Sequence, residues 1–443
     1  DQYVQIAAYI GSSEIYGLGE HTRSSLRGYR NASQCVPIVD KICDIKSMAT
    51  LPQASNTKPF SYLRCKGRLE SRCRDMSSDI VIKTAFFEEK KLCWVDHTAE
   101  FHGCQQRRVD FQHSLTAYTT WPMFARDQFP SSSTSNQNLY GVYPFYIAIE
   151  NDHKAHGVLI LNSNAQELMI GPAPHIVYRT IGGMLDIYFF PGPRPEDVVR
   201  QYAALVGKPA FPPYWGFGYQ NWTELPTKQL HDQSMHAILI FDPAIQVDSE
   251  SFQRGINASA KFVEWERNDQ VPRAIQDLYP LVSNTKIMLG TVWPLKHVAF
   301  PDFSAPETQE WWKNEIVRFH AEVGFDGMWI DMNEPTNIGT NENDTQPITP
   351  NHSDRPYIAP LMCPLNGSDS KYDMPPYETY NVFVYEKGTV KSYLSSKTLC
   401  MLGMTKAGRI YDTKSLYGFF ESIATRAGME AATSKRPAVI TRY

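Results

Sequence analysis

The sequence predicts a two-part protein in which an antiparallel β-sandwich precedes a (β/α) barrel of the TIM type. Two changes of pattern support this prediction. Between residues 121 and 190 short alternating strands recur with turn signals between them, as in a sandwich. After residue 211 strands alternate with helices, as a parallel barrel requires. A doubly wound sheet is the alternative for this second part, because spacing alone does not show whether strands close into a barrel.

The length of 443 residues is too great for one simple domain, so we divide the chain into segments. Residues 1–26 begin the sandwich, 27–112 form a cysteine-rich insert or module, 113–210 complete the sandwich, and 211–443 form a truncated barrel. Within the barrel, residues 338–399 are polar and too long for a plain connection. We interpret them as an active-site lid or an insert.

Four strands and a helix are expected in the sandwich region. Phe145–Ile149 and Gly157–Leu161 flank a polar turn and predict a hairpin. His175–Ile181 and Met184–Phe190 flank two consecutive glycines and predict a second hairpin. A helix with acidic residues in its first turn is expected to begin at Pro195.

Four further strands are expected in the barrel region, each followed by a residue able to bind or react. They are Ala237–Phe241 before Asp242, Lys286–Leu289 before Trp293, Met328–Ile330 before Asp331, and Pro437–Ile440 before Arg442. Because the carboxyl ends of parallel strands meet at one edge, these side chains are expected to converge. Ser304 and Glu307 have the spacing of a capping box that opens a helix, and Gly324 is expected to end it. A last helix is expected at Leu416–Ala432.

Charge and hydropathy exclude several classes of partner. The 43 basic and 47 acidic residues give a formal charge of −4, which argues against nucleic acid and anionic membrane surfaces. No run of about 18 apolar residues is present, so no membrane span is expected in this sequence. The chain begins without Met or a signal peptide, which is typical of a mature or excised piece.

Cysteines and glycosylation sequons indicate the secretory pathway. The eight cysteines lack the close Cys-x-x-Cys pairs of zinc sites, so we expect disulfides and no metal. The Asn-x-Ser/Thr sequons begin at Asn31, Asn221, Asn257, Asn343, Asn351 and Asn366. Paired cysteines beside six sequons favour an extracellular, cell-surface or lysosomal location.

Residues 329–334 concentrate the residues best suited to chemistry. Trp329, Asp331 and Glu334 follow one another closely at the end of an apolar run. Tryptophans at strand ends can stack on sugar faces, and Asp242 and Arg442 can bond hydroxyl groups, so a neutral polyhydroxylated ligand is expected. Glycoside cleavage uses two carboxyl groups, and Asp331 is the natural nucleophile. The alternatives are an ordinary strand-to-loop junction, a core role for Trp293 and a structural ion pair for Arg442.

The hexapeptide Trp329–Glu334 resembles the signature of the family 31 glycoside hydrolases, which include α-glucosidases. Other segments that resemble the family are Ile15–His21, Trp121–Asp127, Leu139–Phe145, Leu161–Ala165, Asp242–Ile245, Val292–Pro294, Phe300–Phe303, Ser396–Cys400, Leu416–Gly418 and Ile440–Arg442. The intestinal maltase-glucoamylase and sucrase-isomaltase group is the most similar.

The resemblance implies a retaining α-glucosidase that removes terminal α-linked glucose from an oligosaccharide or disaccharide without a cofactor. Asp331 is then the nucleophile that forms a covalent glucosyl intermediate, and Glu334 is the neighbouring acid that helps order it. The implied substrate-binding residues are Asp127, Ile240, Asp242, Trp293, Trp329, Met332 and Arg442.

The sequence also departs from the family. The family's acid/base residue follows the motif at Arg442, whereas this sequence stops at Tyr443, and an early barrel strand is missing between Gln220 and Ala237. Two hypotheses therefore remain. The sequence is a partial record of an active α-glucosidase, or it is a catalytically inactive sugar-binding or interaction protein on a truncated glycosidase scaffold.

Overall fold

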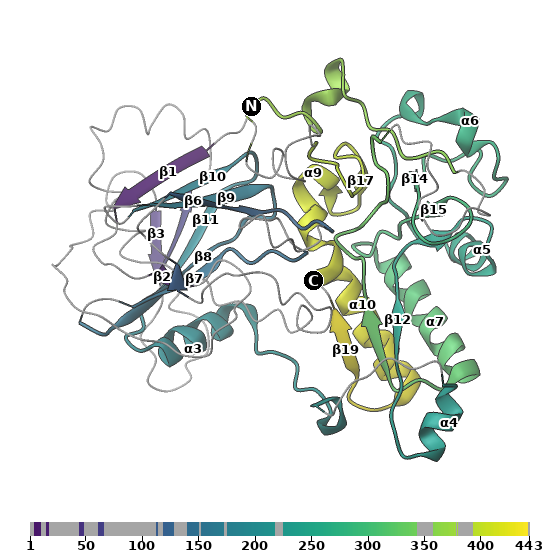
Figure 1. The fold of residues 1–443 in the computed structure, drawn as a ribbon, viewed down its shortest axis with the longest axis horizontal. Helices are drawn as coiled ribbons and strands as arrows, with labels where there is room; N and C mark the ends of the chain where they lie inside the picture. The colour runs from purple at the N-terminus through teal and green to yellow at the C-terminus, as the bar shows by residue number, and fades with distance from the viewer. Residues whose placement is uncertain are drawn as a thin grey trace.

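The computed structural model describes residues 118–127, 140–149, 152–171, 175–217, 225–342, 358–377, 379 and 393–441. It also describes the backbone of the short strands β1 (Val4–Tyr9), β2 (Ile15–Tyr16), β3 (Asp44–Ser47), β4 (Ser61–Cys65) and β5 (Gln112–His113). A β-rich half lies on the left of Figure 1 and a mixed helix-and-strand half on the right. None of the described helices combines the length and apolar composition that a membrane crossing requires.

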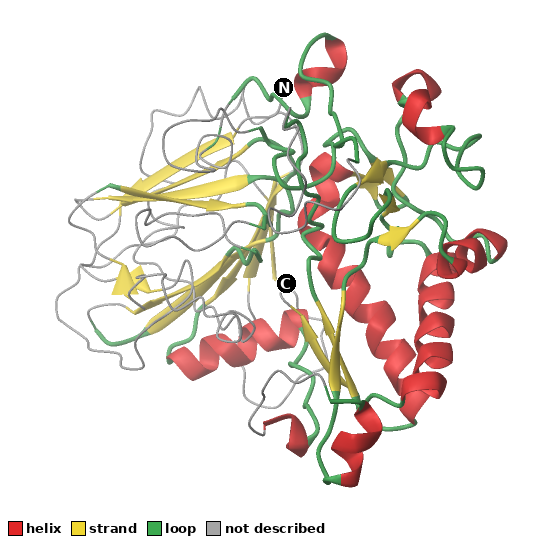
Figure 2. Ribbon diagram, turned by 45° about the vertical axis from the view of Figure 1, so that its right-hand side comes forward, coloured by secondary structure: helices red, strands yellow, loops and turns green. Residues whose placement is uncertain are grey.

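Two antiparallel sheets build the β-rich half. One has the strand order β1-β10-β9-β6 and the other the order β3-β4-β11-β8-β7-β2-β5. The longer strands are β6 (Thr119–Met123), β7 (Phe145–Ile149), β8 (Ala155–Ile160), β9 (Gln166–Gly171), β10 (His175–Thr180) and β11 (Leu185–Phe190). The two sheets form separate layers in Figure 2. Leu168 and Tyr178 of the first sheet join Val158 and Ile187 of the second in one buried cluster.

The helix expected at Pro195 is confirmed as α3 (Pro195–Val206), with Glu196 and Asp197 in its first turn. Its buried residue Val198 packs against the seven-stranded sheet at Gly157, where a Cβ atom would come within 2.5 Å of Val198 Cγ1. Glycine at this position therefore allows the helix to approach the sheet closely.

The hairpin of β7 and β8 is confirmed, because these strands pair in antiparallel register. The second predicted hairpin is wrong: β10 pairs with β1 and β9, whereas β11 pairs with β4 and β8 in the other sheet. The turn between them is a corner at which Asn162 Nδ2 donates to Gly182 O over 3.1 Å. Alternation shows which residues point inward but not which strand lies alongside, so the sequence could not distinguish a hairpin from a corner.

Three parallel strands form the centre of the mixed half: β12 (Ile238–Phe241), β16 (Gly327–Ile330) and β19 (Ala438–Thr441). Their order is β12-β16-β19, with β16 paired to both neighbours, and the sheet is open among the described strands. The helices α7 (Pro306–Val323) and α10 (Tyr417–Thr433) lead into β16 and β19 and lie together beside the sheet in Figures 1 and 2.

The start of α7 differs from the prediction. Its N-cap is Ala305, which makes no side-chain cap, and Pro306 is its first residue. The Ser304 side chain instead accepts a hydrogen bond from Ala407 N over 3.0 Å. Proline at the first helical position has no N–H, so the helix start has one unpaired donor fewer. At the other end Gly324 has φ 73°, which confirms the predicted glycine cap.

The segment expected as a fourth parallel strand is also different. β14 covers only Leu289–Gly290 and pairs antiparallel with β15 (Val298–Ala299), which in turn pairs with β13 (Ile245–Gln246). Pairing with a strand so near in sequence costs little loop-closure entropy. A short apolar run does not reveal this choice of partner.

The remaining described elements are short. They are η1 (Tyr214–Phe217), α4 (Thr227–Asp232), α5 (Glu250–Asn257), η2 (Asn268–Gln270), α6 (Arg273–Gln276), η3 (Ser368–Lys371), β17 (Met404–Thr405), β18 (Gly408–Arg409), α9 (Ile410–Thr413) and η4 (Lys414–Leu416).

The β-rich half contacts the mixed half through buried polar groups. Arg126 donates to Tyr393 O and Leu394 O over 3.0 and 3.2 Å. Asn164 Nδ2 donates to Asp412 Oδ1 over 2.8 Å, and Tyr411 Oη donates to Ile181 O over 2.7 Å. These contacts place the segment that follows β6 next to the loops of the mixed half.

One of the expected disulfides is present, between Cys363 and Cys400, and the side chains of the other six cysteines lie outside the described residues. It closes a loop with a sequence separation of 37. Replacing both cysteines by alanine is expected to lower the free energy of unfolding by about 3–4 kcal/mol, because the unfolded chain regains that loop's entropy. Urea unfolding of the oxidised protein and the double variant measures this. An unchanged midpoint would contradict it.

Candidate active site

Asp331 lies directly after the central strand of the parallel sheet. Its N–H donates to Phe241 O over 3.0 Å, which extends the pairing of β12 and β16 by one residue. The side chain is only 5% exposed, and Asp331 Oδ1 accepts a hydrogen bond from Met332 N over 2.8 Å. The carboxylate is therefore held at the carboxyl end of β16 by local backbone contacts.

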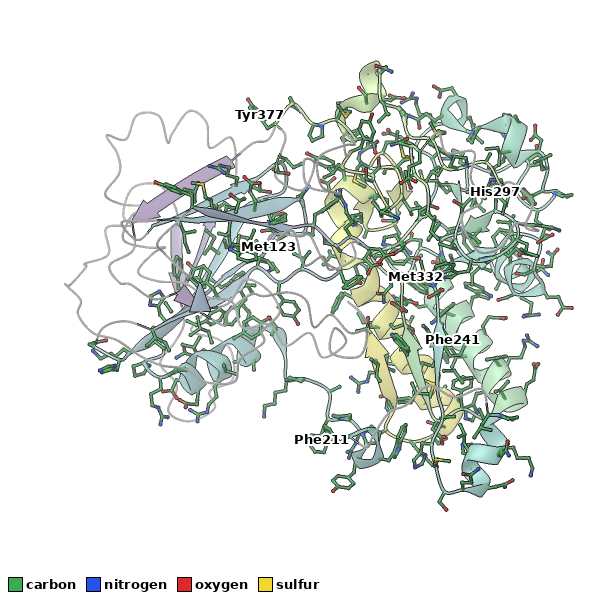
Figure 3. The ribbon with its side chains drawn as sticks, in the orientation of Figure 1. Met123, Phe211, Phe241, His297, Met332 and Tyr377 are labelled. Carbon is green, nitrogen blue, oxygen red and sulfur yellow. A yellow bond between two sulfur atoms is a disulfide. The ribbon has the colours of Figure 1, made fainter. Side chains whose placement is uncertain are left out.

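Met332 turns the chain away from the strand. Its φ of 55° is a left-handed conformation that side chains other than glycine seldom adopt, and such residues are frequent at functional sites. Trp293 Nε1 lies 2.7 Å from Met332 Sδ, while the Trp293 side chain is 49% exposed. Figure 3 places Met332 above Phe241, toward the carboxyl ends of the strands. Trp293 therefore offers an accessible aromatic surface next to the turn that carries Asp331.

The loop that follows is fixed by side chains from three segments. Asn333 Nδ2 donates to Thr441 Oγ1 over 3.1 Å, and the Thr336 hydroxyl donates to the Glu334 carboxylate. Thr398 Oγ1 donates to Pro335 O over 2.6 Å. Because Thr398 lies close to Cys400, the disulfide-linked segment also supports this loop.

Two buried basic side chains, Lys414 and Arg126, lie near this loop. Lys414 Nζ donates to Glu334 O over 3.4 Å and lies 4.2 Å from the centre of the Phe124 ring. Burial, and then repulsion from Arg126, hold the pKa of Lys414 well below its usual range. Burial also lowers the pKa of Arg126 to about 10. The β-rich half thus contributes Phe124 and Arg126 to the surroundings of Glu334.

A fourth carboxyl group joins Asp242, Asp331 and Glu334. Glu421 of α10 is fully buried, and its pKa is raised well above the ordinary value by burial first and by those three acids next. The Asn333 side chain acts in the opposite direction. The site is therefore acidic, with carboxyl groups in different environments, which is the arrangement that acid–base and nucleophilic chemistry uses.

The predicted site residues come together only in part. Asp242 follows β12 and Asp331 follows β16, so the paired strands bring these two to the same edge. Ile240 is 42% exposed, and Trp329 and Asp127 are partly buried. Arg442 lies outside the described residues, as do the sequons at Asn31, Asn221, Asn343 and Asn351. The side chains of Asn257 and Asn366 are exposed.

Sequence reasoning missed Lys414 and Glu421. Each is a charged residue at or within a helical stretch, where the ordinary expectation is an exposed side chain. The only local indication that Glu421 is buried was its spacing from Tyr417, which places both on the same face of α10. Among the described residues no group of three His, Cys, Asp or Glu side chains is arranged to hold a metal ion.

Asp373 lies between Cys363 and Cys400, in the disulfide-linked segment that supports the loop after Asp331. Its side chain is fully buried. Burial raises its pKa to about 7 from 3.8, although the Ser395 side chain and Met401 N favour the ionised form. Between about pH 4 and 7 the unfolded chain loses this proton while the folded protein keeps it. Stability contributed by the neutral form is therefore complete below pH 4, decreases as the pH rises to 7 and stays constant above it.

The Asp373→Asn variant is expected to lose this pH dependence, because its side chain stays neutral. The interval from 3.8 to about 7 corresponds to a difference of about 4 kcal/mol. Urea unfolding at pH 4.5 and 7.5 measures most of it, and the wild-type decrease should exceed the decrease in the variant by about 3 kcal/mol, because the unfolded chain has already lost part of this proton at pH 4.5. Parallel decreases in the two proteins would contradict the prediction.

A buried carboxylate at the carboxyl end of a central parallel strand, beside an exposed tryptophan, is the arrangement found in the active sites of enzymes with a parallel α/β fold. A family model described as the glycosyl hydrolases family 31 TIM-barrel domain matches residues 221–443. The chain belongs to the glycosyl hydrolases of family 31, as the motif at residues 329–334 predicts.

Curated relatives agree with this assignment. Intestinal sucrase-isomaltase of Oryctolagus cuniculus is 32% identical over 390 residues, which cover 75% of this chain and 19% of the relative. Lysosomal alpha-glucosidase of Bos taurus is 32% identical over 373 residues, which cover 74% of this chain and 36% of the relative. The chain therefore spans between about a fifth and about a third of the length of these relatives.

Solved structures support the fold. A structure of the glucosidase II alpha subunit has a TM-score of 0.50 at 16% identity, and the match covers 72% of this chain and 34% of that chain. The parallel sheet is thus part of the family's TIM-barrel domain, although the described strands form an open sheet.

Proposed function

We propose that the protein is a retaining α-glucosidase that hydrolyses a terminal non-reducing α-linked glucose from a malto-oligosaccharide or a related sugar. Asp331 is the nucleophile and forms a covalent glucosyl intermediate that water then hydrolyses. Glu334 helps to order the nucleophile loop through its hydrogen bond with Thr336. The observation that carries the proposal is the buried Asp331 carboxylate at the carboxyl end of β16.

The substrate-binding roles follow from position. Trp293 supplies an exposed ring for one face of the sugar, and Ile240 and Trp329 lie on paired positions of β12 and β16 below Asp242 and Asp331. Asp242 is suited to accept hydrogen bonds from sugar hydroxyl groups. Met332 supports Trp293, and Asp127, which follows β6 in the β-rich half, keeps the binding role that the family resemblance implies. Arg442 keeps the binding role that the family resemblance implies.

We also infer that the two antiparallel sheets are the N-terminal β-sandwich of such an enzyme, since one buried cluster contains side chains of both. β3 and β4, from the segment 27–112, pair onto β11 of the larger sheet. In this proposal residues 113–210 complete the sandwich and residues 211–443 belong to the barrel.

Hydrolysis of an aryl α-glucoside by the full-length protein that contains this sequence tests the proposal. Release of α-glucose as the first sugar product, followed by NMR, is the expected result for retention. Initial release of β-glucose would contradict retention. Binding of maltose without turnover would support the second candidate, an inactive sugar-binding protein.

We propose that the protein passes through the secretory pathway and acts outside the cell, on its surface or in lysosomes. The disulfide at Cys363 and the exposed sequons at Asn257 and Asn366 support this. Removal of N-glycans is expected to lower the intact mass of the secreted protein, and Asn257→Gln and Asn366→Gln are each expected to remove one glycan. A mass unchanged by both the treatment and the substitutions would contradict glycosylation.

A further inference from the structure

The Glu421 carboxyl lies in the interior of the mixed half, and neither of its oxygens has a hydrogen bond of ordinary geometry. A polar side chain that interacts with it is Asn333, in the loop that carries Asp331; this contact favours the ionised form but is outweighed by burial and the nearby acids. Asn333 Oδ1 is also buried without a hydrogen bond. Each buried oxygen without a hydrogen bond costs about 1–3 kcal/mol. Because Glu421 and Asn333 interact and both have such oxygens, the missing hydrogen bonds require an explanation.

A neutral carboxyl group resolves the deficit. Asn333 Nδ2 already donates to Thr441 Oγ1 over 3.1 Å, which leaves the amide oxygen as the group that needs a donor. An ionised Glu421 could only accept, whereas a protonated one carries an O–H that can donate to Asn333 Oδ1. The same pair can return the second Asn333 N–H to the other carboxyl oxygen.

The surrounding charges favour the neutral form. The charged groups that act most on Glu421 are the acids Asp242, Asp331 and Glu334, from the two loops at the strand ends. Tyr417, on the same helix, is a further acidic group near Glu421, and burial raises its pKa well above the ordinary value. A fourth negative charge in this buried cluster would be repelled by the others.

We propose that Glu421 is a positioning residue: a neutral carboxylic acid that donates a hydrogen bond to Asn333 and so fixes the loop that holds Asp331. Asn333 then joins α10 through Glu421 and β19 through Thr441, while its backbone lies two residues beyond Asp331. The kinetic part of this inference rests on the proposed α-glucosidase activity.

Infrared difference spectroscopy of the full-length protein tests the protonation state without reference to activity. At neutral pH the wild type is expected to show the carbonyl stretch of a buried protonated carboxylic acid, which Glu421→Gln removes. Asp373→Asn is the matched control, because it removes another buried acid whose pKa is raised and leaves the Glu421 band. A spectrum unchanged by Glu421→Gln would mean that Glu421 is ionised and can only accept hydrogen bonds, which would overturn the proposal.

Kinetics test the positioning role. Glu421→Gln keeps a neutral donor of the same shape and is expected to retain kcat within about threefold. Glu421→Met removes the donor and is expected to lower kcat by about 10- to 100-fold with little change in KM, because a small displacement of the nucleophile is enough. Equal losses in both variants, or a harmless Glu421→Met, would overturn the role. An inactive wild type would contradict the proposed function instead, and the infrared band would still decide whether the neutral acid exists.

Discussion

Asp331→Ala is expected to lower kcat for an aryl α-glucoside by about 10⁴-fold or more, with the protein still folded. The substitution removes the group that forms the covalent intermediate, and loss of a nucleophile has effects of this order in other enzymes that react through covalent intermediates. The space left by the Asp331 carboxylate also admits a small external nucleophile. Added azide is therefore expected to restore release of the aryl group and to give the β-glucosyl azide, because it attacks once, from the face that Asp331 occupied.

Asp326→Asn is the matched control, since Asp326 precedes the same strand at its opposite end. There Asp326 Oδ2 accepts from Ala237 N over 2.9 Å and contacts His231, remote from the carboxyl end of β16. This variant is expected to keep kcat within about threefold, since it lies outside the reacting groups. Full activity of Asp331→Ala, or restoration by azide with α configuration, would exclude Asp331 as the nucleophile.

Trp312→Ala is expected to destabilise the mixed half strongly. Trp312 is buried between α7 and α10, where its Nε1 donates to Thr425 Oγ1 over 2.9 Å. Its ring packs edge-on against Phe303 with centroids 5.2 Å apart. Truncation of a buried tryptophan costs about 3–5 kcal/mol through lost contacts and the cavity left behind. The urea midpoint should fall accordingly.

Trp312→Phe separates the packing from the hydrogen bond. Most of the ring contact remains while Thr425 loses its donor, so a loss of about 1–2 kcal/mol is expected. The two helices lead into β16 and β19, and the strand ends carry Asp331 and the Thr441 that holds Asn333. Activity of Trp312→Ala should therefore be lost at a lower temperature than in the wild type. Equal midpoints for the alanine variant and the wild type would show that this contact does not support the sheet.

Local sequence patterns were sufficient wherever one segment carries the whole signal. The strands at β12, β16 and β19, the glycine that ends α7 and the hairpin of β7 and β8 all follow from short-range periodicity and turn residues. The position of Asp331 after a buried strand follows in the same way.

Pairing between segments was beyond those patterns. The assignment of β10 and β11 to different sheets and the antiparallel pairing of β14 depend on which surfaces meet when the chain collapses. A strand has the same alternation whichever neighbour it pairs with, and an isolated run of apolar residues is equally suited to several.

By itself, the sequence determined the family and the identity of Asp331 as the candidate nucleophile, because the motif at residues 329–334 is contiguous. Only the tertiary structure decided how that residue is held. Lys414, Glu421 and Arg126 lie far from residues 329–334 in the sequence and have ionisable side chains, so their burial could not be expected from their local sequence. Their place in the interior depends on partners that the fold brings together: the Glu334 carbonyl, the Asn333 side chain, and the Tyr393 and Leu394 carbonyls.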